Sequence, residues 1–228
     1  MAQFFSNFYS HEVLSFEHFI NCVKSLYSGP ESLDSNTLHL LAEMLYQLAQ
    51  NKKFLASQVS LSKSYQHHTK GLLDNDDLYV LYQNQRPFFK VCAQIWHPIP
   101  KRGSLKNSEP ILRDYNFASL TTNYFGPGCA AQLYKYQTRP DLNVGQHCGL
   151  AFNQFHQLNS DEVMFVEASK DVLAQALPKS LSISISLMFE QNKRSSFTFD
   201  QLTGRVRSKI AEQPLQQGAL VAEPAVTF

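Results

Sequence analysis

The stretch PILRDYNFASLTTNYFGPG, residues 110–128, decides the fold class of this chain. Residues 117–125 predict a β-strand that ends at the turn sequence Gly126-Pro127-Gly128. On either side, residues 89–95 and 181–189 place apolar side chains at every second position, which is the period of a strand. The centre of the chain is therefore predicted to be β-structure.

Further short strands are predicted at residues 131–137, 149–156 and 162–168. Turn sequences such as Arg139-Pro140-Asp141 and Asn159-Ser160-Asp161 separate them. Short strands in succession, without helices between them, are typical of a β-sandwich or barrel. We therefore expect a mainly β fold. Residues 206–211 suit either a strand or a helix.

The first third of the chain shows the period of helices instead. Phe16, Phe19 and Val23 belong to an apolar stripe that predicts a helix between an N-cap at Ser15 and a stop at Gly29-Pro30. A second helix, capped by Asp34 or Ser35, aligns four leucines: Leu38, Leu41, Leu45 and Leu48. We expect an α-helical region at residues 1–73, packed on a barrel at residues 74–211, and an extended tail at residues 212–228.

The composition limits the functional classes. The chain has 228 residues, with 20 Lys and Arg against 19 Asp and Glu, a net charge of +1. This balance offers no basic field, so neither nucleic acid nor a membrane is an expected partner. The N-terminus lacks the pattern of a signal peptide, and we expect a cytoplasmic protein. The four cysteines have no metal-binding spacing and are expected to be free thiols.

Several short motifs occur in an order that resembles a known family. They are Ile95-Trp96-His97-Pro98, Asp114-Tyr115-Asn116-Phe117, the sequence TTNYFGPG at residues 121–128, Ala168-Ser169-Lys170-Asp171-Val172 and Leu181-Ser182-Ile183-Ser184-Ile185. In this order they resemble a bacterial group of metal-dependent cupin-like proteins, distantly similar to cysteine dioxygenase. The resemblance covers about half the chain. It implies a double-stranded β-helix, that is, a cupin-like barrel preceded by a small helical region.

At the metal-ligand positions the chain departs from that group. The resemblance places His-Asp-His where this chain has Arg113-Asp114-Tyr115, and a third histidine at Leu173. The expected glutamate is also missing, since Ser119 and Leu120 stand there. Arginine stays protonated, offers no lone pair, and repels a cation 4 Å away by roughly 4 kcal/mol at an effective dielectric near 20. We therefore predict a degenerate site that holds no metal and no cofactor.

Arg113 is the leading candidate for a ligand-binding residue. At the barrel mouth, its planar guanidinium would bind a carboxylate or phosphate, and Tyr115 on the same strand face would add a hydroxyl. The alternatives for Arg113 are an ion pair with Glu162 or Glu167, or exposure to solvent. The alternative for Tyr115 is ordinary aromatic packing.

A metal site rebuilt from other residues is a second possibility. His147 and His156 are the candidate ligands, with Asp114 and Cys148 as co-ligands. The two histidines are nine residues apart, so on one strand they would face opposite sides unless a bulge or loop intervenes.

The sequence carries no motif for nucleophilic catalysis. It contains no Gly-x-Ser-x-Gly elbow, no H-E-x-x-H and no phosphate-binding Gly-rich loop. Ser182, Ser184 and Ser186 share one face of a strand, where they line the barrel or meet solvent.

Three functions therefore remain open. The first is a degenerate cupin-like protein that binds a small anion or acts as a partner or regulatory protein, with a second copy of itself or another protein as partner. The second is a metal-dependent dioxygenase or isomerase with non-standard ligands. The third is an interaction module that docks through the N-terminal region, using aromatic residues expected to be exposed: Phe4, Phe5, Phe8 and Tyr9.

Overall fold

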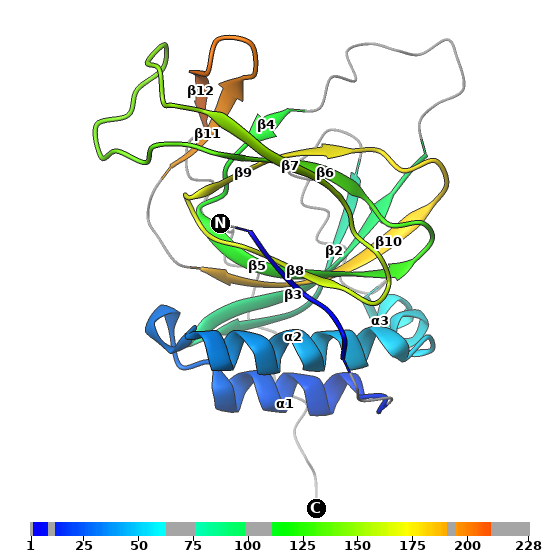
Figure 1. The fold of residues 1–228 in the computed structure, drawn as a ribbon. Helices are drawn as coiled ribbons and strands as arrows, with labels where there is room; N and C mark the ends of the chain where they lie inside the picture. The colour runs from blue at the N-terminus through cyan, green and yellow to red at the C-terminus, as the bar shows by residue number, and fades with distance from the viewer. Residues whose placement is uncertain (1, 9–11, 63–75, 99–110, 191–194, 211–228) are drawn as a thin grey trace, which may run out of the picture.

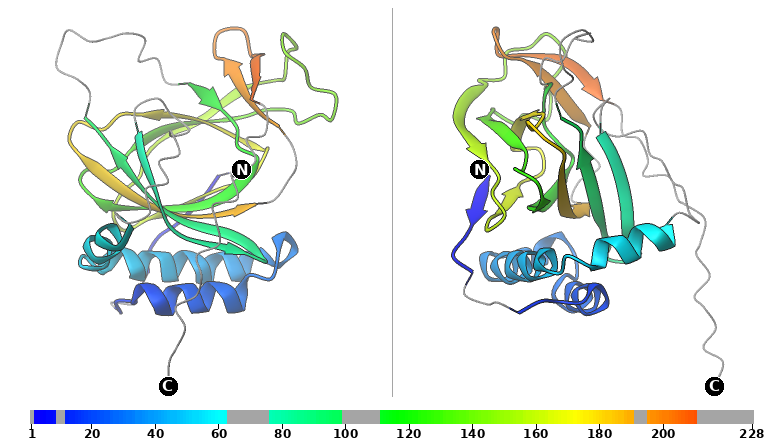
Figure 2. Two further views of the ribbon diagram at one scale, coloured as in Figure 1. Left: turned by 180° about the vertical axis from the view of Figure 1, so that it is seen from behind. Right: turned by 90° about the vertical axis from the view of Figure 1, so that its right-hand side faces the viewer.

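Two six-stranded antiparallel sheets face each other, and helices cover the outer surface of one of them (Figures 1 and 2). The computed structural model describes residues 2–8, 12–62, 76–98, 111–190 and 195–210. Sheet A runs, in spatial order, β1 (Gln3–Phe5), β8 (Val163–Val166), β5 (Phe117–Phe125), β10 (Ser182–Glu190), β3 (Phe88–Trp96) and β2 (Asp76–Gln85). Sheet B runs β12 (Arg205–Ile210), β11 (Ser196–Asp200), β4 (Leu112–Arg113), β9 (Asp171–Ala176), β6 (Ala130–Lys135) and β7 (Ala151–Gln157).

Strands β3 to β10 wind between the two sheets as a double-stranded β-helix. Sheet A holds four of them in the order β8-β5-β10-β3, and sheet B holds the other four in the order β4-β9-β6-β7. Along these eight strands, the chain changes sheet after every strand except between β6 and β7, which form a hairpin. This is a jelly-roll topology. The prediction of a mainly β, cupin-like barrel with helices before it is confirmed.

The helices are α1 (Phe16–Leu26), the short 3₁₀ helix η1 (Pro30–Ser32), α2 (Ser35–Gln50) and α3 (Phe54–Ser62). Two of the helices, α1 and α2, begin where the sequence predicted, whereas η1 and α3 were not predicted. Ser15 caps α1 by accepting from the backbone N–H of His18 at 3.2 Å, and Asp34 caps α2 by accepting from that of Thr37 at 2.7 Å. None of the helices in the described ranges combines the length and apolarity needed to cross a membrane.

Alternate residues of sheet A form the core beneath the helices. Leu41, Leu45 and Leu48 of α2 are fully buried in the same core as Val91 of β3 and Leu120 of β5. Full burial of each such side chain contributes about 1.5–3 kcal/mol. The apolar residues that recur at every second position of the strands therefore pack against those that recur every three to four positions in the helices, and together they form one apolar layer.

The other face of the same strands lines the barrel interior and is more polar. The indole Nε1 of Trp96 donates to Ser184 Oγ at 2.9 Å, and the hydroxyls of Thr121 and Ser186 share a hydrogen bond of 2.9 Å. Ser182 is also buried. The three alternating serines of β10 therefore line the barrel, which was one of the two alternatives open from the sequence.

The N-terminal segment differs from the exposed docking surface that the third hypothesis required. Residues Gln3–Phe5 form β1, which pairs with β8 at the edge of sheet A (Figure 1). Three aromatic residues expected to be exposed are half-buried: Phe4, Phe5 and Phe8. The ring centroid of Phe4 lies 3.9 Å from that of His156, and Phe8 stacks on Tyr46 at 4.7 Å. Their exposure was wrongly predicted because strand pairing ties this segment to the barrel; Tyr9 lies outside the described residues.

Four strands of the described residues were not predicted from the sequence: β1, β2, β4 and β9. Strand β4 has only two residues, too few to show a period, and β9 follows the apparent strand at residues 162–168 after a short turn. The segment that suited strand or helix near residue 206 forms β12. The predicted tail at residues 212–228 lies outside the described residues.

The four cysteines are free thiols, as predicted, and three of them are buried: Cys92, Cys129 and Cys148. Cys92 projects from β3 into the barrel interior, where burial raises the pKa of its thiol to about 12. At neutral pH this thiol is therefore protonated and a poor nucleophile.

Candidate functional site

The barrel brings together two positions at which the resemblance implied metal ligands. Arg113 on β4 lies directly opposite Leu173 on β9, and its other cross-strand neighbour is Thr198 on β11. Side chains of directly opposed residues point to the same face of a sheet. Arg113 is only 5% exposed, so the alternative that it points to solvent is wrong.

Tyr115 connects Arg113 to a small cavity between the sheets. The guanidinium carbon of Arg113 lies 4.7 Å from the centroid of the Tyr115 ring, a cation–π arrangement. Tyr115 and Leu173 both line the cavity, whose volume is about 50 Å³. The remaining lining residues are mostly small or flexible and include Gln94, Ser119, Thr121, Met164, Gln175 and Ser186. Since one water needs roughly 10–15 Å³ of such space, the cavity holds a group of about three or four non-hydrogen atoms.

Four charged side chains are buried among the described residues: Lys90, Arg113, Asp114 and Asp171. Lys90 lies on the interior face of β3, because its neighbours Phe89 and Val91 pack against the helices. Its ammonium group lies 5.4 Å from the ring centroid of Phe88. Two cationic side chains therefore project into the barrel from opposite sheets. The carboxylate of Asp171 accepts from the backbone N–H of Glu167 at 2.9 Å.

Asp114 is a structural residue of sheet B. It is fully buried; its Oδ2 accepts from the Tyr136 hydroxyl and its Oδ1 from the backbone N–H of Phe197, both at 2.5 Å. The Tyr136 hydroxyl also lies 3.0 Å from the carbonyl oxygen of Ser169. These contacts tie β4 to β11 and to the turn before β9, and they occupy the carboxylate that was a candidate co-ligand.

The two candidate ligand histidines have separate partners. His156 Nε2 lies 2.9 Å from Glu162 Oε2, and the same carboxylate accepts from Asn159. Glu162 is thus engaged elsewhere and is not the partner of Arg113. His147 forms a backbone bridge with Arg205. Across the described ranges of the chain, no three His, Cys, Asp or Glu side chains gather as they would around a metal ion.

The residues at the implied metal site do not fit a metal centre. A guanidinium and a leucine side chain have no lone pair to donate to a cation. A single phenol, that of Tyr115, is left, and it lies against the positive charge of Arg113. The chemistry of this donor set suits an anion better than a cation.

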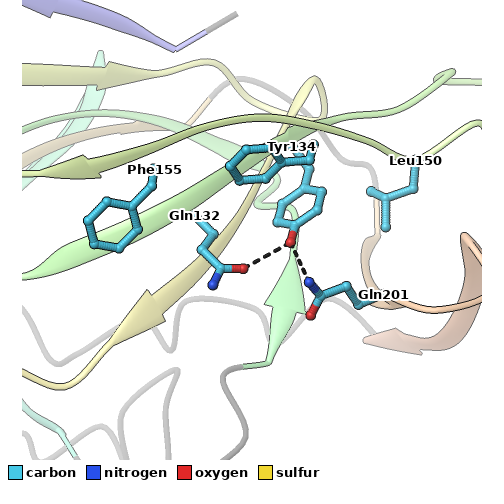
Figure 3. Close-up of a pocket in the computed structure, with 6 residues that line it drawn as sticks. Gln132, Tyr134, Leu150, Phe155 and Gln201 are labelled. Atoms are coloured by element: carbon cyan, nitrogen blue, oxygen red, sulfur yellow. Dashed lines mark hydrogen bonds between the residues drawn. The ribbon is translucent and has the colours of Figure 1, made fainter.

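A larger hollow lies on the opposite, outer face of sheet B, and the sequence did not indicate it (Figure 3). Its volume is about 400 Å³, and six residues line it: Gln132, Tyr134, Leu150, Phe152, Phe155 and Gln201. The Tyr134 hydroxyl donates to Gln132 Oε1 at 2.9 Å and accepts from Gln201 Nε2 at 2.7 Å. Phe152 and Phe155 are three positions apart, and on a regular strand this spacing would place them on opposite faces. The alternation of the sequence therefore gave no sign that the two rings share one face.

Neither a protein-family model nor a curated protein matches the sequence of this chain. Among solved structures, the salicylate 1,2-dioxygenase of Pseudaminobacter salicylatoxidans aligns with 59% of this chain and 31% of its own, at 11% identity and a TM-score of 0.33. An RmlC-like cupin protein from Ralstonia eutropha JMP134 aligns with 62% of this chain and 69% of its own, at 6% identity and a TM-score of 0.34. A DMSP lyase from Ruegeria pomeroyi DSS-3 aligns with 58% and 56%, at 11% identity and a TM-score of 0.29.

This chain thus spans about a third of the length of the dioxygenase that it resembles. Similarities this weak support no argument about function. The fold is established by the strand order of the chain itself.

Proposed function

We propose that this chain is a binding protein on a degenerate cupin-like barrel and that it holds a small anion inside the barrel. Arg113 would be the main contact and Tyr115 its neighbour. The observation that carries the proposal is the buried guanidinium of Arg113, which lies opposite Leu173 and over the ring of Tyr115, two residues that line the interior cavity.

The size of the cavity defines the class of anion. About 50 Å³ accommodates a planar ion of three or four non-hydrogen atoms, such as formate, nitrate or bicarbonate. Most sites for organic ligands measure about 300–1,000 Å³. An aromatic carboxylate such as salicylate is therefore too large for the interior as it stands.

The electrostatics of the interior favour the same class. Lys90 and Arg113 bring two cationic side chains to the barrel interior, and Asp171, on the same face of β9 as Leu173, brings one carboxylate. A planar oxyanion matches the two parallel N–H groups of a guanidinium, and such charge-assisted hydrogen bonds are about twice as strong as neutral ones. The hydroxyls of Ser119, Thr121 and Ser186 offer further polar contacts along the cavity wall.

Thermal melting in increasing formate, nitrate and bicarbonate tests the proposal, with the sodium ion and the ionic strength kept constant. At a concentration one hundred times the dissociation constant, binding stabilises the folded state by about 2.7 kcal/mol. For a chain of this length this raises the melting temperature by roughly 5–10 °C. Arg113→Gln should abolish the shift, whereas Arg207→Gln, which removes the same charge from an exposed position of β12, should leave it intact.

Two results would overturn the proposal. One is an equal response to small anions in the wild-type protein and the Arg113→Gln variant. The other is stoichiometric iron, nickel or zinc that stays with the purified protein through exhaustive dialysis. If Arg113→Gln fails to fold, the proposal is tested instead by the anion-dependent shift of the Lys90→Met variant and by melting the wild-type protein with anions of increasing size. Benzoate, which exceeds the cavity, should then produce no shift, and a shift with benzoate would refute the size argument.

A further inference from the structure

The hollow on the outer face of sheet B is separate from the barrel interior. Leu133, between Gln132 and Tyr134 on β6, belongs to the core inside the barrel, so its two neighbours point to the other side of the sheet. At about 400 Å³, the hollow falls in the range of small-molecule sites, whereas the interior cavity does not. A ligand of more than about four non-hydrogen atoms therefore fits this hollow and not the interior cavity.

A β-bulge assembles the aromatic part of the hollow. In the pairing of β6 with β7, Gln132 lies opposite Phe155 and Tyr134 lies opposite Phe152, because the register shifts between Leu133 and Tyr134. The extra residue brings both phenylalanines to the outer face, where they are 58% and 60% exposed. The edge of the Phe152 ring contacts Tyr134, with centroids 5.4 Å apart. Bulges that redirect side chains in this way are common beside functional sites.

The hydrogen bonds of Tyr134 determine what the two glutamines offer to a ligand. A phenolic hydroxyl has one proton, so it donates to only one amide and accepts from the other. Whichever amide is which, one glutamine keeps a free NH₂ group and the other keeps a free carbonyl oxygen. Figure 3 shows the two amide groups on either side of the Tyr134 hydroxyl. The site therefore presents a donor and an acceptor on either side of one hydroxyl.

A turn outside the hairpin completes this arrangement. Gln201 lies in the turn between β11 and β12, where Asp200 accepts from the backbone N–H of Thr203 at 2.7 Å and from its hydroxyl at 2.8 Å. These bonds hold the turn that carries Gln201 over β6. The polar anchors thus come from two distant segments of the chain and are placed before any ligand arrives.

No lining side chain of the hollow has a formal charge. Burial raises the pKa of the Tyr134 hydroxyl above its usual value, so the phenol stays neutral at physiological pH. A charged ligand would lose solvation here without gaining a counter-charge. The chemistry of the walls therefore selects an uncharged ligand.

We propose that this hollow binds a neutral saccharide. The apolar C–H face of a pyranose ring would pack on Phe152 and Phe155, and its hydroxyls would bond to the free amide groups of Gln132 and Gln201. Hydroxyls project from several points around a sugar ring and each one both donates and accepts, so they reach anchors on both sides of Tyr134. A flat heterocycle offers its donor and acceptor along one edge and matches this spread of anchors less well.

The test is isothermal titration of the purified full chain with methyl β-D-glucoside, methyl β-D-galactoside, methyl N-acetyl-β-D-glucosaminide and cellobiose. For a single ring on an open site, we expect a dissociation constant on the order of 1 mM for at least one of these sugars. Phe152→Ala and Phe155→Ala should each weaken binding tenfold or more. Phe125→Ala removes a phenylalanine of similar exposure, 56%, from sheet A outside the hollow and should change nothing.

Tyr134→Phe separates the hydrogen-bond argument from simple stacking. It keeps the ring but removes the hydroxyl that orders both amides, so affinity should fall at least fivefold while the melting temperature stays close to that of the wild-type protein. The proposal is overturned if none of the four sugars binds at concentrations up to 50 times the expected dissociation constant. It is also overturned if Phe155→Ala leaves the affinity unchanged. A dimer that dissociates in the Phe155→Ala variant would also overturn it, because the hollow would then belong to a second copy of the chain. Arg113→Gln should leave sugar binding intact, since the two sites lie on opposite faces of sheet B.

Discussion

Replacing Asp114 by alanine tests whether this carboxylate holds sheet B together. The substitution removes two short hydrogen bonds to a fully buried carboxylate, from the Tyr136 hydroxyl and the Phe197 N–H, each 2.5 Å long. Hydrogen bonds to charged groups contribute about 1.5–3 kcal/mol each. The Tyr136 hydroxyl can turn fully to the carbonyl oxygen of Ser169, 3.0 Å away, but the N–H of Phe197 is left unsatisfied. We therefore expect the free energy of unfolding to fall by about 3–5 kcal/mol, a large part of the 5–15 kcal/mol typical of a domain.

Urea unfolding monitored by the fluorescence of Trp96 is the appropriate assay. This residue is the single tryptophan of the chain and is 1% exposed inside the barrel, so its emission reports the opening of the two sheets. Asp161→Ala, at an exposed position, is the matched control and should change the unfolding free energy by no more than about 0.5 kcal/mol. Asp114→Asn keeps one carbonyl oxygen for the Phe197 N–H and should cost about 1–2 kcal/mol.

A loss below about 1 kcal/mol for Asp114→Ala would refute this reasoning, since a buried N–H without an acceptor costs at least that much. A double-mutant cycle with Tyr136→Phe gives an independent check. Because the two side chains are in direct contact, their coupling should lie between about 0.5 and 3 kcal/mol. Additive effects of the two substitutions would mean that the hydrogen bond between them contributes nothing.

Three further predictions concern other parts of the fold. Maleimide labelling at neutral pH should modify the partly exposed Cys22 and spare Cys92, whose pKa of about 12 keeps it protonated; raising the pH should not label Cys92 until the protein unfolds. Gly128→Ala should lower the unfolding free energy by at least about 2 kcal/mol more than Gly145→Ala; both have φ near +80°, but only the first would place a Cβ 2.0 Å from a carbonyl oxygen. Deleting residues 2–8 should cost about 3 kcal/mol in urea unfolding, because three half-buried rings and strand β1 are lost; unchanged stability would restore the view of this segment as a free docking arm.

Periodicity predicted the parts of the fold in which one face of an element is uniformly apolar. Residues 117–125 and 181–189 were assigned as strands and became β5 and β10, because alternate residues of both pack beneath the helices. Strand β4 has two residues and owes its existence to pairing with β9 and β11, so no local pattern records it. The bulge in β7 was equally invisible, since it depends on the register of a neighbouring strand.

Some residues of the candidate sites could likewise be identified from the sequence, and others could not. The resemblance pointed to Arg113 and Leu173 although 60 residues separate them, and the structure makes them cross-strand neighbours. Sequence alone could not decide whether Arg113 faced solvent, because exposure depends on strands that approach it from both sides. Gln201 could not be linked to Gln132 from the sequence, since the two amides meet through the hydroxyl of Tyr134.

The interior and the outer face of sheet B set opposite limits on what this barrel can recognise. Inside, the Trp96 indole bonded to Ser184, together with Leu133 and Met164, fills the space and leaves about 50 Å³ among the described residues. Enlarging that space for an organic substrate would break the buried indole hydrogen bond and unpack three large side chains, each worth about 1.5–3 kcal/mol of burial. Outside, the 400 Å³ hollow already exists and needs no rearrangement. Under the two proposals, the interior would therefore take a small ion, and the outer surface of sheet B would take a larger molecule.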